Sequence, residues 1–75
     1  MLSPEMTVAD VAGEMRAAGF HVSNKAIVDR IASGLYPFGR IIGVGRSGRR
    51  TVHVLRVDFQ RWLEDVTRYE EVYQQ

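Results

Sequence analysis

The segment GRIIGVGRSGRRTVHVLR, residues 39–56, decides the fold that this sequence predicts. Two short runs rich in β-branched residues flank a stretch of glycine, serine and arginine. Residues 41–44 have the composition of one strand and residues 51–56 that of its partner, and residues 45–49 suit the connecting turn. The segment holds five arginines and no acid. It therefore predicts a β-hairpin with a strongly cationic tip.

Two short amphipathic helices are predicted before the hairpin. Apolar residues recur every three or four positions in residues 7–15, after Thr7 as an N-cap, and Gly19 ends this pattern. A second pattern of this kind occupies residues 23–34, where a Ser-Asn pair can cap the start and a Ser-Gly pair the end. Two such helices joined by a few residues predict a helix-turn-helix.

A third helix is predicted after the hairpin, with Asp58 as its N-cap and Phe59 and Trp62 on its core-facing side. Between the second helix and the hairpin, LYPFG (residues 35–39) interrupts helical structure. We expect Leu35, Tyr36 and Phe38 to close the open end of the core. The fold class predicted is α+β, in the order helix, helix, strand, strand, helix.

The composition predicts a single domain of 75 residues, with residues 1–6 flexible and residues 69–75 a candidate interaction tail. There is no cysteine, and the two histidines lack the spacing of metal ligands. No metal or cofactor is expected. Neither a secretory signal nor a membrane-spanning stretch is apparent, so a soluble, cytoplasmic protein without membrane contact is predicted.

Charge is segregated along the chain although the net charge is only +1. Residues 40–61 hold six arginines against one acid, whereas residues 62–75 hold four acids and one arginine. The hairpin is thus predicted to be the positive end of an electrostatic dipole. Arginines on an exposed turn can simply protect a strand edge from aggregation, but the scarcity of acids within this segment favours an anionic partner.

A helix-turn-helix followed by a two-stranded hairpin is the winged-helix arrangement, in which the second helix enters the major groove of DNA. Ile27 and Ile31 must face the core, so the rest of the second helix faces outward. Asn can read adenine, and Lys can reach guanine or a phosphate. The predicted recognition-helix residues are Ser23, Asn24, Lys25, Val28 and Asp29.

Two of these residues have a structural role as an alternative. Ser23 can donate to a phosphate or can simply cap the helix. Asp29 can accept from a cytosine amino group or pair with Lys25 four residues earlier, and the pairing within the helix is favoured.

The hairpin would serve as the wing beside this helix. Small residues in the turn let backbone amides and guanidinium groups approach a phosphate or a narrow groove closely. The predicted wing residues are Arg46, Ser47, Gly48, Arg49 and Arg50.

The segments TVADVAGEM, VSNKAIVDRIASG, YPFGRI and RRTVHVLRVDFQRWLE resemble the small excisionases of phages, plasmids and conjugative transposons, a MerR-like winged-helix family. The resemblance covers residues 7–64. It implies a recombination directionality factor, of which several copies bind and bend double-stranded DNA and help an integrase to excise a mobile element. It also implies base-facing positions at Asn24, Lys25 and Val28 and a wing at Arg46, Arg49 and Arg50.

Other functions stay open at this point. The same arrangement resembles small terminase subunits and single-domain repressors, which bind DNA without directing excision. A protein-interaction module is an alternative of another class, acting through Tyr69, Val72 and Tyr73 of the acidic tail. An enzyme is not expected, because no catalytic residues in a suitable arrangement and no phosphate-binding loop are recognisable.

Overall fold

A computed structural model describes residues 3–74, with side chains described as far as Arg68. The elements follow the predicted order of helix, helix, strand, strand and helix, and one further short strand precedes them. They are β1 (Glu5–Met6), α1 (Val8–Ala17), α2 (Asn24–Ala32), β2 (Gly39–Val44), β3 (Arg50–Leu55) and α3 (Arg56–Gln74). The predicted α+β class is confirmed, and the arrangement is that of a winged helix-turn-helix.

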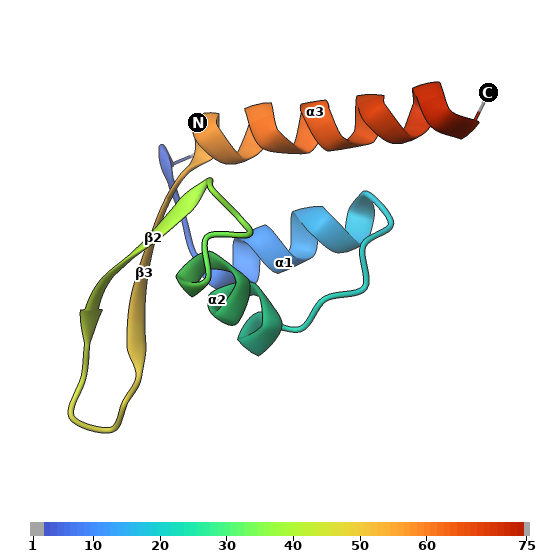
Figure 1. Ribbon diagram of the computed structural model, residues 1–75. Helices are drawn as coiled ribbons and strands as arrows, with labels where there is room; N and C mark the ends of the chain where they lie inside the picture. Colours follow the sequence, from blue (N-terminus) through green and yellow to red (C-terminus); the bar gives the residue numbers. More distant parts are fainter. Residues whose placement is uncertain (1–2, 75) are drawn as a thin grey trace.

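The three strands form one antiparallel sheet in the order β1-β3-β2. β2, β3 and the turn at residues 45–49 make a hairpin, called the wing from here on, which projects away from α3 and runs beside α2 (Figure 1). The bulge in the ladder between Ile41 and Gly43 interrupts its regular register. The wing is therefore the part of the sheet that extends beyond the helices.

β1 differs from the predicted flexibility of residues 1–6. Met6 pairs with Val54 of β3 and is only 5% exposed, and the Arg56 amide donates to the Pro4 carbonyl at 2.8 Å. Glu5 and Met6 thus form a strand because β3 offers an unpaired edge and the core takes up the methionine side chain. Residues 1 and 2 lie outside the described part of the chain.

Local hydrogen bonds fix the start of both helices of the helix-turn-helix. The Thr7 hydroxyl accepts from the Asp10 amide at 3.0 Å, and the Asp10 carboxylate accepts from the Thr7 amide at 3.1 Å. This capping box lowers the pKa of Asp10, chiefly through the bond from the Thr7 backbone. At α2 the Ser23 hydroxyl accepts from the Ala26 amide at 3.1 Å. Of the two candidate caps of α2, Ser23 is the cap and Asn24 the first helical residue.

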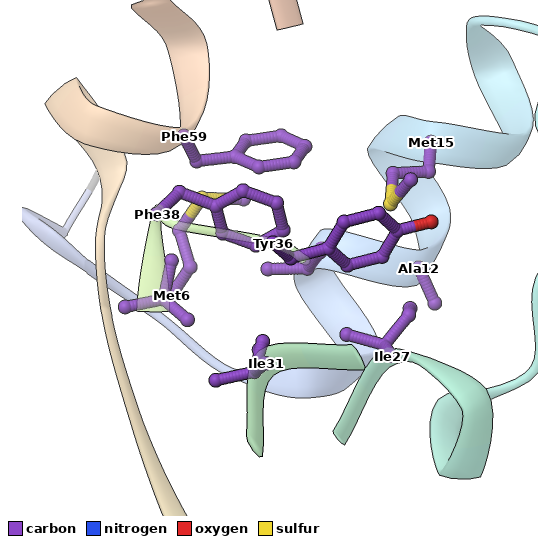
Figure 2. Packing of buried hydrophobic residues seen from close by; sticks show 10 residues of the cluster. Met6, Ala12, Met15, Ile27, Ile31, Tyr36, Phe38 and Phe59 are labelled. Carbon is purple, nitrogen blue, oxygen red and sulfur yellow. The ribbon is translucent and has the colours of Figure 1, made fainter. Parts of the chain in front are cut away.

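The core gathers apolar side chains from every element (Figure 2). Phe59 of α3 lies above the Phe38 ring, with an edge-to-face contact at a centroid distance of 5.0 Å. Trp62 is half-buried and packs 4.9 Å from the same ring. The predicted core role of Phe59 and Trp62 is confirmed. The buried residues are Met6, Val11, Ala12, Met15, Ile27, Ile31, Tyr36, Phe38, Val54 and Phe59.

Two predictions about the ends of the core are wrong. Tyr36 and Phe38 are buried as predicted, but Leu35 is 65% exposed. The rings of Tyr36 and Phe38 stack on each other at 5.3 Å and close the core without it. Asp58 is not the N-cap of α3, because the helix begins directly after β3, at Arg56. Its carboxylate lies instead in the first helical turn, where a negative charge still interacts favourably with the helix dipole.

A close approach at Gly39 sets the position of the wing against α2. A Cβ atom at this position would lie 3.0 Å from Ile31 Cδ1 and 3.1 Å from Val54 Cγ2. Glycine therefore lets the first residue of β2 pack directly against α2. This contact holds the wing beside the exposed face of that helix.

Candidate nucleic-acid interface

An open groove with a volume of about 390 Å³ lies between α2 and the far end of the wing. It brings together side chains that are far apart in the sequence, because α2 contributes one wall and the wing the other. Its lining residues are Val8, Asn24, Lys25, Val28, Asp29, Gly48, Arg49 and Arg50. We call it the α2–wing groove.

The outward face of α2 forms one wall, as predicted from the apolar spacing. Ile27 and Ile31 are buried in the core, while Asn24 and Lys25 are exposed and Val28 is half-buried. Amide and ammonium groups thus stand beside an apolar strip on the same wall. Ser23 is exposed, and its hydroxyl accepts the capping hydrogen bond described above, so its alternative structural role is confirmed.

The turn of the wing is held by two backbone hydrogen bonds. The Gly45 amide donates to the Arg49 carbonyl at 2.7 Å, and the Gly48 amide donates to the Gly45 carbonyl at 3.0 Å. Gly48 has a φ of 81°, a left-handed conformation that side-chain-bearing residues rarely adopt. Arg46 and Ser47 are exposed within the turn but do not line the groove.

Strand alternation directs Arg50 toward α2. Arg50, Val52 and Val54 lie on the same face of β3, and Val54 on this face is buried in the core. Arg50 Nη2 lies 3.1 Å from Asp29 Oδ1. The predicted pairing of Asp29 with Lys25 is therefore wrong, because the wing presents a guanidinium group to the same carboxylate across the groove.

The cationic segment does not form a single surface. Arg40 pairs in register with His53 on the face of the sheet that points away from the core. Arg56 Nε donates to the Ser3 carbonyl at 2.8 Å and fastens the residues that precede β1. The positive charge that the sequence assigns to one hairpin tip is thus divided, and Arg46, Arg49 and Arg50 are the arginines that remain at the far end of the wing.

Val8 is the groove residue that sequence reasoning missed. It begins α1 and is half-buried, and the helical spacing assigned it to the core only. The sequence carries no signal for its second role, because its exposed part faces the groove only when the wing is folded beside α2. Tyr69, Val72 and Tyr73, the candidate partner contacts, have side chains outside the described part of the structure.

Compared with protein-family models, curated proteins and solved structures, the chain matches none. Within residues 3–74, no helix combines the length and apolar character needed to cross a membrane. The same described residues contain no cluster of three or more acidic or histidine side chains suited to hold a metal ion.

Proposed function

We propose that the protein binds double-stranded DNA, with α2 in the major groove and the wing on the adjacent backbone or minor groove. The observation that carries this proposal is the α2–wing groove, where Asn24 and Lys25 stand opposite Arg49 and Arg50. Amide and ammonium groups on a helix suit base edges, and arginines on a glycine-rich turn suit phosphates. One surface thus offers both base readout and backbone contact.

The dimensions of the two elements agree with this placement. The nine residues of α2 make a helix about 14 Å long, while the major groove is about 12 Å wide. A single module of this size buries only about 600 to 1,000 Å² of its surface on DNA. Specific recognition therefore requires further copies of the chain on neighbouring sites or a second DNA-bound protein.

Within this class we favour a recombination directionality factor that helps an integrase to excise a mobile element. The support for this finer role is the resemblance of residues 7–64 to small excisionases. A gene for a tyrosine or serine recombinase beside the gene for this protein would support the role. A neighbouring gene for a large terminase subunit would contradict it in favour of DNA packaging.

The general test of DNA binding is its dependence on salt. If about five phosphates are neutralised, the observed association constant should fall with a log-log slope of about −4 to −5 against salt concentration. Fluorescence anisotropy with a labelled mixed-sequence duplex measures this slope directly. A response that stays flat between low and moderate salt would refute duplex binding through the wing and α2.

Replacing Asn24 with alanine should reduce base discrimination and leave the fold intact. Asn24 is the exposed first residue of α2, and its amide is suited to a bidentate contact with adenine. We expect a loss of preference at one base pair of about 1 to 3 kcal/mol, with little change on other sequences. Affinities for single-base variants of a duplex enriched by the wild-type protein would measure it. Equal weakening on every duplex would mean that Asn24 contacts the backbone instead.

A further inference from the structure

Among residues 3–68, one ion pair crosses the α2–wing groove, and it connects residues 21 positions apart. It joins Arg50 Nη2 to Asp29 Oδ1 at 3.1 Å. Asp29 is also the one acid among the described residues that line the groove, beside the cations Lys25, Arg49 and Arg50. A carboxylate at this place works against the anionic partner that the other charged groups suit.

The pair restrains Arg50 without locking it. The Arg50 side chain is 37% exposed and the Asp29 side chain 48% exposed. Pairs this accessible to water contribute little to stability and are screened by salt. A phosphate can therefore compete for the guanidinium group, because an arginine can make two parallel hydrogen bonds to a phosphate.

The Asp29 carboxylate opposes this exchange. Once Arg50 turns to a phosphate, the carboxylate is left unpaired near the polyanionic backbone, where like charges repel. A cytosine amino group is a hydrogen-bond donor that can take up the carboxylate in the major groove. On a duplex that offers no such donor, the repulsion has no compensation. Sequence-independent binding is thus weakened more than binding to a matched site.

We infer that Asp29 determines specificity by holding Arg50 across the α2–wing groove and repelling phosphates, which suppresses binding to arbitrary duplex DNA. The inference rests on the proposed function. It assigns to Asp29 a role opposite to that of the surrounding cations, because the carboxylate limits the contribution of the wing to non-specific affinity.

The test is an Asp29→Asn variant on a short mixed-sequence duplex. Asparagine keeps the size of the side chain and removes its charge, so Arg50 becomes free to neutralise one further phosphate. At low salt we expect binding to strengthen about threefold to tenfold and the log-log salt slope to steepen by about 0.9. Adding Arg50→Ala to this variant should abolish the steepening.

Glu14→Gln is the matched control, because it removes the same charge from an exposed position on α1 that does not line the groove. Thermal melting of each variant verifies that it is folded. If Asp29→Asn binds no more tightly than Glu14→Gln, or binds more weakly than wild type, the inference is overturned while the proposed function stands. A wild-type protein whose duplex binding is absent or insensitive to salt would instead overturn the proposed function.

Discussion

Replacing Arg46, Arg49 and Arg50 together with alanine is expected to remove most of the affinity for duplex DNA. All three residues are exposed on the wing, and Arg49 and Arg50 line the α2–wing groove. Loss of three phosphate contacts should flatten the log-log salt slope by about 2.7 and lower affinity about 10²- to 10³-fold at low salt. Binding should weaken on every sequence alike, because phosphate contacts carry no sequence information. Anisotropy titrations at several salt concentrations measure both quantities.

A matched triple variant separates the wing from general electrostatics. Arg16, Arg40 and Arg61 are exposed on α1, β2 and α3 and lie outside the groove, and their replacement by alanine removes the same net charge. We expect this control to weaken binding several-fold less than the wing variant. Equal losses in the two variants, with both proteins folded by circular dichroism, would show that the wing has no special part in binding.

The helices and the hairpin could be predicted because their signals are local. Apolar spacing and capping side chains define α1 and α2 within a few residues, and a glycine-rich turn between β-branched runs defines the wing. β1 could not be predicted this way. Two residues carry no periodicity, and Glu5 and Met6 become a strand only by pairing with β3, about fifty residues later.

The candidate site divides along the same line. That Asn24 and Lys25 face outward followed from the buried positions of Ile27 and Ile31 on one helix. The partner of Asp29 did not follow, because local spacing favours Lys25, while Arg50 reaches the same carboxylate through tertiary packing. The close approach at Gly39 that places the wing against α2 is likewise a contact between separate elements.

Arg30 shows how a charged residue can be accommodated where helical spacing alone gives no reason for it. Its guanidinium group donates to the Tyr36 hydroxyl at 2.8 Å and lies 5.6 Å from the centre of the Tyr36 ring. The side chain is half-buried and pairs with the polar end of a core aromatic residue. Arg30 therefore contributes to packing at the end of α2, and we do not include it in the proposed DNA contact.

Phe59→Ala is expected to be the most destabilising of these changes. Phe59 is completely buried and connects α3 to the core through the edge-to-face contact with Phe38. Truncation of a buried phenylalanine costs about 3 to 5 kcal/mol in the free energy of unfolding. A chain of this length is expected to have only about 4 to 11 kcal/mol in total. Chemical denaturation followed by circular dichroism should therefore place the variant near or beyond the limit of folding.

Val57→Ala is the matched control, because Val57 lies two residues earlier on α3 and is 61% exposed. Its unfolding free energy should stay within about 0.5 kcal/mol of wild type. Phe59→Leu keeps most of the apolar volume and should fall between the two, so an effect can be measured even if the alanine variant does not fold. If Phe59→Ala unfolds at the wild-type denaturant concentration, α3 does not pack on this core. The sheet and the wing would then have to hold their position against α2 without α3, which is incompatible with the packing of Phe38 between Tyr36 and Phe59.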